Sequence, residues 1–139
     1  MGNKRITKNA TEQYAMDRLK EAGIFEGYEN KKYTLVEEFH FENDVWARTQ
    51  NGKGEFKNRG DEKIRPITYT PDFVGTDYII EVKGYIRQGS YDAFPLRFKL
   101  FKKWLKSNNI GKTLYVPRNK KEIDKTIKLI LQGRKNNRL

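Results

Sequence analysis

A short hairpin pattern in the middle of the chain restricts the possible folds more than any other segment. Residues 64–73 favour a strand, a turn follows at 74–77, and residues 78–83 favour a second strand rich in β-branched side chains. So short a turn makes the two strands antiparallel neighbours in one sheet. Pro66 and Pro71 lack the N–H that a central strand needs, so each must lie at an edge, an end or a bulge.

Helices and further strands are expected on both sides of this hairpin. Apolar residues recur at helical spacing in residues 9–22, in residues 95–106 and from residue 119 onward. Residues 33–41 alternate with a strand period, and residues 113–117 form a short apolar run that is typical of a buried strand. The expected order is therefore helix, three strands, helix, strand and a C-terminal helix, which is a mixed α/β (α+β) arrangement.

The length of the chain and its hydrophobic content of 36% are those of a single core. No repeat or linker composition interrupts the sequence, so residues 1–139 are expected to form one domain. Asn51-Gly52 favours a mobile hairpin within residues 44–63. Residues 1–8 are expected to be a mobile N-terminus, and residues 132–139 a basic C-terminal tail.

Charge and composition narrow the classes of function. The chain carries 29 basic and 18 acidic side chains, so its formal net charge is +11 at pH 7. Clustered Lys and Arg release condensed counterions when they bind phosphates, which favours nucleic acid as the partner over a charge that serves solubility alone. The absence of cysteine excludes disulfides, thiolate zinc sites and cysteine nucleophiles, and the single histidine, His40, excludes His-paired metal motifs. No apolar run is long enough for a membrane span, so a soluble protein of the cell interior is expected.

The hairpin carries the residues that are best placed for chemistry. Asp72 ends the first strand, whereas Glu81 and Lys83 lie two residues apart on one face of the second. Asp72 can therefore lie beside Glu81. Two close carboxylates repel each other unless a cation lies between them, and oxygen ligands suit Mg²⁺. The alternative is an ordinary ion pair between Glu81 and Lys83 on a solvated sheet face.

Pro71-Asp72 and Glu81-Val82-Lys83 resemble the two motifs of the PD-(D/E)XK nuclease superfamily. The expected order of elements from about residue 9 to residue 117 resembles the restriction-endonuclease-like core of that superfamily. The stretches Tyr69-Thr70-Pro71-Asp72-Phe73 and Glu81-Val82-Lys83-Gly84 are similar to those of phage endonuclease I type Holliday-junction resolvases and related small phage nucleases.

This resemblance implies a metal-dependent DNA endonuclease. Asp72 and Glu81 would bind the metal, the backbone carbonyl of Val82 would add a further ligand, and Lys83 would act in catalysis as a base or as an electrostatic stabiliser. Mg²⁺ is the expected metal, and Mn²⁺ is expected to substitute. Many members also carry a carboxylate on the first helix, and Glu12 is the matching residue here. An equally good interpretation of Glu12 is a capping box with Asn9 at the start of that helix.

The helix expected at 95–106 is divided into a broad apolar arc and a basic arc. The apolar arc begins at Leu96, and Arg97 falls inside it, where it could extend toward solvent or toward phosphate. The basic arc is either a solvated face or a surface that follows the phosphate backbone of DNA. Its members are Lys99, Lys102, Lys103 and Lys106.

The expected function is hydrolysis of DNA phosphodiester bonds, and in its sharper form the resolution of four-way or other branched DNA. Such a junction is cut on two strands related by approximate two-fold symmetry, so a homodimer is expected. Residues 33–41 and 44–63 are the exposed candidates for its contacts. If the protein is phage-encoded, its place is the cytoplasm of the bacterial host. The alternatives are a restriction-like or replication-associated nuclease on duplex or flapped DNA, and a non-catalytic basic DNA-binding protein.

Overall fold

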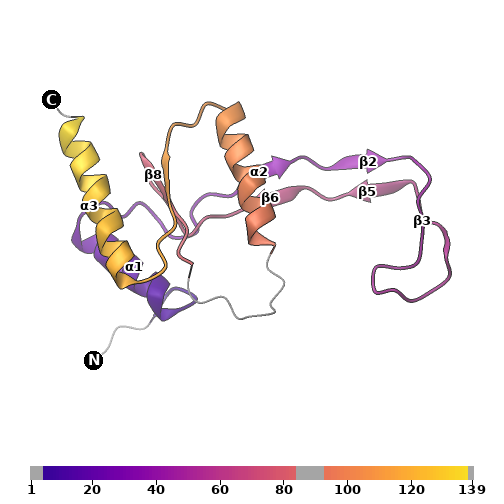
Figure 1. Cartoon of the computed structure of the whole chain (residues 1–139), viewed down its shortest axis with the longest axis horizontal. Helices are drawn as coiled ribbons and strands as arrows, with labels where there is room; N and C mark the ends of the chain where they lie inside the picture. Colours follow the sequence, from indigo (N-terminus) through magenta and orange to yellow (C-terminus); the bar gives the residue numbers. More distant parts are fainter. Residues whose placement is uncertain (1–4, 84–92, 138–139) are drawn as a thin grey trace. The chain divides into compact units, whose positions relative to one another are not determined.

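The computed structural model describes residues 5–83 and 93–137, and it has the mixed α/β composition expected from the sequence. The chain divides into two compact units (Figure 1). The helix-sheet unit contains the residues up to Lys32 and from Thr70 onward, and the ribbon unit is Tyr33–Tyr69. Within the described residues, no helix combines the length and apolar character needed to cross a lipid bilayer.

The sheet of the helix-sheet unit has three short strands, β7 (Phe73–Val74), β8 (Tyr78–Ile80) and β9 (Thr113–Tyr115). Strands β7 and β8 are antiparallel, with Phe73 opposite Ile80, so the expected hairpin is confirmed. Strand β9 runs parallel to β8. The backbone N–H groups of Glu81 and Lys83 extend this pairing past β8 by donating to the carbonyls of Tyr115 and Pro117, each at 3.0 Å.

Three helices lie close to the positions expected from the sequence. They are α1 (Ala10–Glu21), α2 (Phe94–Ser107) and α3 (Lys120–Asn136). Pro95 lies in the first turn of α2, where its missing N–H is not needed. Residues 132–136 of the expected basic tail belong to α3, in which Arg134 forms an ion pair with Asp77 at 2.8 Å. Residues 138 and 139 of that tail lie outside the described residues.

The main core lies where α1 and α3 cover one face of the sheet. Alternation along β8 directs Tyr78 and Ile80 into this core, while Ile79 is buried outside it. Figure 1 shows α2 on the other side of β8 from α1 and α3, and Phe101 of α2 is fully buried. The core cluster consists of Ala15, Met16, Leu19, Ile24, Phe73, Tyr78, Ile80, Val82, Ile123, Ile127 and Ile130.

The residues before α1 are attached to the helix-sheet unit. Thr7 is buried, and the backbone N–H groups of Ile6 and Thr7 donate to the side-chain oxygen of Gln13 at 2.9 and 3.2 Å. Lys8 forms an ion pair with Glu29 at 2.9 Å. Of the N-terminus expected to be mobile, residues 5–8 are therefore fixed by contacts, and residues 1–4 lie outside the described residues.

The ribbon unit is a succession of two-stranded antiparallel pairs. The pairs are β1 (Tyr33–Val36) with β6 (Ile67–Tyr69), β2 (Phe39–Phe41) with β5 (Glu62–Ile64), and β3 (Trp46–Ala47) with β4 (Lys57–Asn58).

The ribbon corrects the two long strands expected at 33–41 and 64–73, because each is divided. Pro66 lies between β5 and β6, and the register of the opposite strand shifts between Thr34 and Val36. The missing proline N–H thus coincides with a break in the pairing, as expected. The hairpin expected within residues 44–63 is present as the β3 and β4 pair.

Candidate metal centre and nucleic-acid surface

Asp72 and Glu81 face each other across the β7 and β8 hairpin. The register that pairs Phe73 with Ile80, extended by one residue, places Asp72 opposite Glu81. Asp72 is buried, and its Oδ2 accepts a hydrogen bond of 2.7 Å from the backbone N–H of Val82. Burial, a hydrogen bond with Glu81 and the charge of Glu81 raise the pKa of the Asp72 carboxyl to about 7. The two carboxylates that the sequence pointed to therefore lie together and repel when both are ionised.

Glu12 brings a third carboxylate from α1. Asn9 caps this helix, because its Oδ1 accepts the backbone N–H of Glu12 at 2.9 Å, and its side-chain amide also contacts Glu12 Oε2. The carboxylate itself is buried, and the hydroxyl of Tyr28 donates to its Oε1 at 2.8 Å. Burial and the nearby Asp72 raise the pKa of Glu12, and the Tyr28 hydrogen bond opposes that rise.

Helix α3 begins with the same asparagine cap as α1, so it allows the two interpretations of Glu12, cap residue and metal ligand, to be compared. Asn119 caps α3, and Glu122 occupies the position that Glu12 has in α1. The Glu122 carboxylate is exposed and accepts the backbone N–H of Arg118 at 2.9 Å. Glu12 instead directs its carboxylate inward, although burial of a carboxylate is costly. The cap is therefore real, and it does not account for the inward direction of the Glu12 side chain.

Glu29 is a fourth carboxylate, which the sequence analysis missed. It lies in the loop after α1 with a left-handed φ of 48°, and its backbone N–H donates to the carbonyl of Asp72 at 2.7 Å. Such a φ is unfavourable for a glutamate and is compensated by the bond that fixes the loop against Asp72. No motif surrounds Glu29, so the sequence offered no signal beyond its nearness to Gly27 in a turn-like segment.

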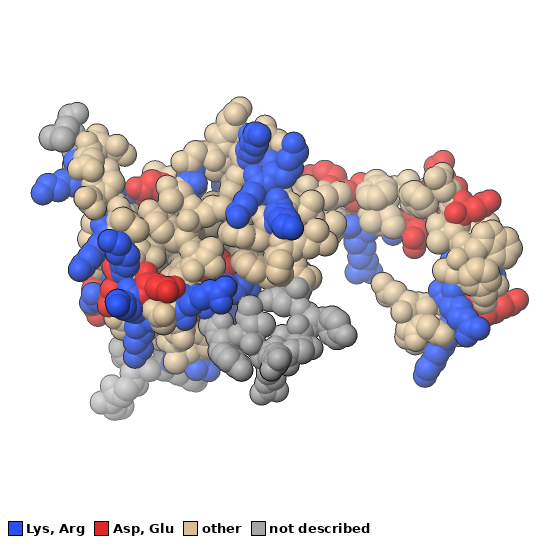
Figure 2. Space-filling view, in the orientation of Figure 1, with Lys and Arg blue, Asp and Glu red and all other residues tan. Residues whose placement is uncertain are grey.

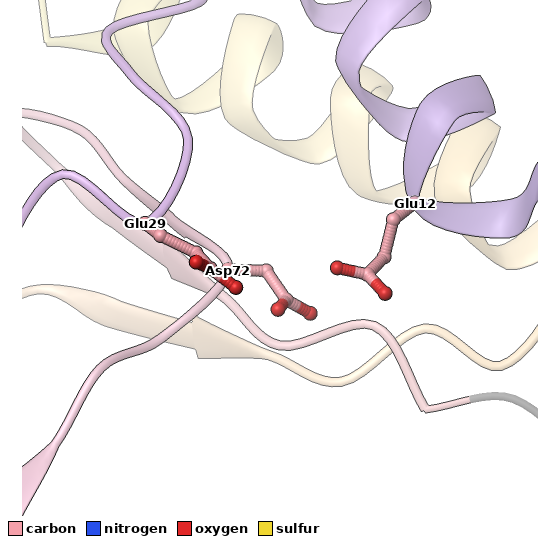
Figure 3. A group of neighbouring side chains, drawn as sticks. All are labelled: Glu12, Glu29 and Asp72. Atoms are coloured by element: carbon pink, nitrogen blue, oxygen red, sulfur yellow. The ribbon is translucent and has the colours of Figure 1, made fainter. Parts of the chain in front are cut away.

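Glu12, Glu29 and Asp72 form an acidic triad that could hold a metal ion. One carboxylate oxygen from each residue lies within 4.8 Å of the others. Figure 3 shows the Glu12 side chain leaving α1 toward Asp72, with the Asp72 and Glu29 carboxylates directed back toward it. An all-oxygen donor set of this kind matches the preference of hard divalent cations. Glu81 borders the triad through its hydrogen bond with Asp72.

Lys83 is directed toward α2, and Val82 is directed toward the core. The Lys83 ammonium lies over the ring of Phe94 in α2, with 3.7 Å between Nζ and the ring centroid. Val82 turns its side chain into the core and its backbone N–H toward Asp72. Glu81 and Lys83 are both partly exposed.

The basic residues of α2 are exposed, and Figure 2 shows lysine and arginine side chains gathered over this helix. The ammonium of Lys102 lies 4.8 Å from the ring centroid of Phe98. The exposed members are Arg97, Lys99, Lys102, Lys103 and Lys106.

The apolar arc of α2 is narrower than the sequence analysis expected. Phe101 and Leu105 are buried, but Leu96 is 67% exposed and Arg97 is exposed with it. At about 100° per residue, Leu96 lies nearly opposite the line through Phe101 and Leu105, which explains its exposure. Leu96 is therefore not a core residue, and Arg97 does not lie in an apolar environment.

Comparisons of the chain with protein-family models, with curated proteins and with solved structures find no significant match.

Proposed function

We propose that this protein is a metal-dependent endodeoxyribonuclease of the PD-(D/E)XK type. The observation that carries the proposal is the pairing of Asp72 with Glu81 across the β7 and β8 hairpin. Lys83 follows Glu81 by two residues. An ordinary surface ion pair does not need a buried aspartate beside a second carboxylate, nor a third carboxylate from α1. The restriction-endonuclease-like core belongs to this proposal, supported by the order of α1, β7, β8, α2 and β9 along the chain.

Mg²⁺ is the proposed metal, with Mn²⁺ as a substitute, because the donors are carboxylates. Asp72 and Glu81 would hold it, with the carbonyl of Val82 and the Glu12 carboxylate completing the protein ligands. Glu29 is an additional candidate from the triad. When bound, such a metal polarises the phosphodiester and makes a hydroxide nucleophile available near neutral pH.

The side chains around the site would position the substrate and manage charge. Lys83, supported by Phe94, lies on the sheet beside Glu81, where it can orient water or stabilise the charge that develops on phosphorus. The lysines of α2 would hold the sugar-phosphate backbone without reading its sequence. The net charge of +11 supports a polyanionic substrate.

The finer form of the proposal is a resolvase of branched DNA that acts as a homodimer. The described part of each chain offers one acidic site, and a four-way junction needs two cuts related by approximate two-fold symmetry. This form predicts a dimer that prefers four-way junctions to linear duplex of the same arm sequence.

The test is cleavage of linear, flapped and four-way DNA in Mg²⁺ by the wild type and by Asp72→Asn, Glu81→Gln and Lys83→Met. We expect each substitution to lower the rate at least about a hundredfold, because each removes a metal ligand or the transition-state cation. DNA binding in EDTA should stay within about twofold. Glu122→Gln is the matched control and should cut at the wild-type rate.

Wild-type cleavage by Asp72→Asn would show that the assigned site is wrong. Absence of cleavage by the wild type on every substrate, with binding retained, would favour the non-catalytic DNA-binding protein. Equal cleavage of linear and four-way DNA by a monomer would remove the resolvase and favour the restriction-like or replication-associated nuclease.

A further inference from the structure

The far end of the ribbon unit presents two large aromatic rings to solvent. We call residues 43–60, which include β3 and β4, the ribbon tip. Trp46 and Phe56 are each 61% exposed, and their ring centroids lie 6.2 Å apart. Trp46 pairs with Asn58, so Phe56, two residues before Asn58, lies on the same face of the two-stranded pair. The tip therefore carries an exposed aromatic surface on one face of a two-stranded pair.

The two strands of the tip are joined by hydrogen bonds within the tip itself. The guanidinium of Arg59 donates to the carbonyls of Ala47 and Glu55, each at 2.9 Å, and so ties the two strands together. The turn is closed by Thr49, whose N–H donates to the carbonyl of Lys53 at 2.9 Å. The exposure of the rings is thus a property of a defined turn, since internal contacts hold the strands on which they lie.

Charge is distributed unevenly along the ribbon unit. The tip contains four basic and two acidic residues, whereas the rest of the ribbon contains two basic and five acidic residues. Alternation places Arg48 opposite Phe56 on the face that carries the rings. Lys53 and Lys57 are also exposed. The rings consequently lie in the one part of the ribbon whose charge suits a phosphate backbone.

We propose that the ribbon tip binds unpaired nucleotides, with bases stacked on Trp46 and Phe56 and phosphates paired with Arg48 and its basic neighbours. Aromatic side chains beside basic groups are the usual platform for single-stranded nucleic acid. The faces of bases are already covered inside a duplex, so such a platform selects bases that have left the stack. The inference rests on the proposed function in taking DNA as the partner, and it narrows the substrate to DNA with unpaired bases, at a branch or a flap.

The chain contains two tryptophans, so Trp104→Phe leaves Trp46 as the single fluorescent reporter. The experiment titrates this full-length variant with single-stranded oligothymidine and with a blunt duplex, in EDTA to prevent cleavage. We expect oligothymidine to quench Trp46 in a saturable way, and the duplex to leave its emission unchanged. Binding measured by anisotropy of a labelled oligonucleotide should weaken about tenfold in Trp46→Ala and in Phe56→Ala. Trp46→Tyr, which keeps an aromatic face, should restore most of the affinity.

Phe39→Ala is the matched control, because Phe39 is also an exposed aromatic residue of the ribbon but lies outside the tip. It should bind oligothymidine like the wild type. Equal weakening by Phe39→Ala, or unchanged binding by Trp46→Ala, would overturn the proposal. Emission that changes with protein concentration alone and not with DNA would overturn it in favour of contact with a second copy of the chain. Binding by the ribbon tip is measured in EDTA, whereas the proposed function is measured by cleavage in Mg²⁺. A failure of one proposal can therefore be told from a failure of the other.

Discussion

Two glutamates with the same place in two capped helices have different surroundings. Glu12 and Glu122 each lie three residues after a capping asparagine, and in each case the asparagine Oδ1 accepts the glutamate N–H at 2.9 Å. The hydroxyl of the loop residue Tyr28 holds the Glu12 carboxylate inward, close to the buried Asp72, while the Glu122 carboxylate stays at the surface. Whether the glutamate carboxylate is buried or exposed therefore depends on the residues that pack against the start of the helix. The cap motif, which is the same in both helices, does not reveal this difference.

This difference predicts how metal ions affect stability. A cation that binds only the folded chain stabilises it by mass action, about 2.7 kcal/mol at a hundredfold excess over Kd, which raises Tm by about 8 °C. Thermal unfolding followed by circular dichroism in EDTA and in millimolar Mg²⁺ or Mn²⁺ measures the rise. Glu12→Gln should lose at least half of it, because a carboxylate ligand becomes a neutral amide. Glu122→Gln should keep all of it, and an equal loss in both variants would contradict a site at Glu12.

Phe94 is expected to position Lys83 in the proposed reaction. The ring lies 3.7 Å from the ammonium, and a cation over an aromatic face is held by about 1 to 2 kcal/mol when it is partly desolvated. Phe94→Leu keeps apolar bulk without the aromatic face, so kcat should fall about tenfold with KM unchanged. Phe94→Tyr should restore kcat.

Lys102→Met is the control for Phe94, because Lys102 also lies over an aromatic ring of α2, that of Phe98, and its removal leaves the stacked rings of Phe94 and Phe98 in place. That variant should raise KM and leave kcat unchanged. If Phe94→Leu behaves like Lys102→Met in steady-state kinetics, the Phe94 ring serves substrate binding and does not position Lys83.

At the scale of elements, α2 combines a narrow buried line with a basic surface. Phe101 and Leu105 are its buried residues, and the Phe98 ring lies between Phe101 and the ammonium of Lys102, at 6.3 and 4.8 Å from the ring centroid. Lysine stems that cover an aromatic ring keep their charged ends at the surface. Helix α2 therefore exposes positive charge to solvent, while the lysine stems keep part of its aromatic surface covered.

Removal of lysines from this helix should change the salt dependence of DNA binding. Each phosphate contact contributes about −0.9 to the slope of log K against log salt on B-DNA. Lys99→Ala combined with Lys103→Ala should reduce the magnitude of the slope by about two, equally for unrelated sequences, because phosphate contacts carry no sequence information. Lys125→Ala with Lys128→Ala in α3 removes the same charge from another exposed face. An identical change in both double variants would mean that overall charge, and not α2, sets the slope.

The turn between β7 and β8 is fastened to the end of α3 by charge. Arg134 bonds Asp77 with two nitrogens, at 2.9 and 2.8 Å, and also contacts Glu26 at 3.2 Å. The hydrogen bonds from Arg134 lower the pKa of Asp77 below its usual 3.8. A carboxyl with a lowered pKa in the folded state stabilises the fold above its unfolded pKa, and this contribution is lost as pH falls through the lower folded value.

Asp77→Asn should therefore destabilise the protein near neutral pH by about 1 kcal/mol or less, since the partly exposed pair is screened by solvent. The difference from the wild type should shrink as the pH falls from about 3.8 through the lowered folded pKa, because the wild-type carboxyl then also becomes neutral. Urea unfolding across this range measures both. Asp17→Asn, an exposed carboxylate of α1, should show little difference at any pH. A difference for Asp77→Asn that does not depend on pH would assign its effect to packing and not to charge.

For the whole molecule, the two units differ in how well the sequence predicts them. The helices and the hairpin of the helix-sheet unit have strong local patterns, such as the Asn9 cap and the β-branched run at 78–83, so their positions follow from the sequence. Strand breaks in the ribbon depend on Pro66 and on the facing register, which no period reveals. Glu29 joins the acidic triad through the tertiary fold, because its loop is fixed by Asp72, more than forty residues later in the sequence.

The first and last strands of the ribbon unit, β1 and β6, are paired with each other. Tyr33 pairs with Tyr69 and Val36 with Ile67, so a two-residue Asn-Gly turn can replace residues 37–66 between adjacent strands. We expect the shortened chain to fold with an unchanged Tm and to keep the metal-induced rise, since the acidic triad lies entirely in the helix-sheet unit. Circular dichroism and Tm with and without Mg²⁺ check this. Loss of cooperative unfolding would show that the ribbon is needed for the core.

The packing of α1 against α3 has a consequence for synthesis on the ribosome. Met16 and Leu19 of α1 are buried in one cluster with Ile123 and Ile127 of α3, which are made more than a hundred residues later. At about 5 to 20 residues per second, α3 follows α1 by about 5 to 20 s, so for that time α1 can pack only on the earlier members of the cluster, such as Phe73 and Ile80. The contacts of the Glu12 carboxylate come from Asn9, Tyr28 and Asp72, so every partner of the acidic triad is made before α3.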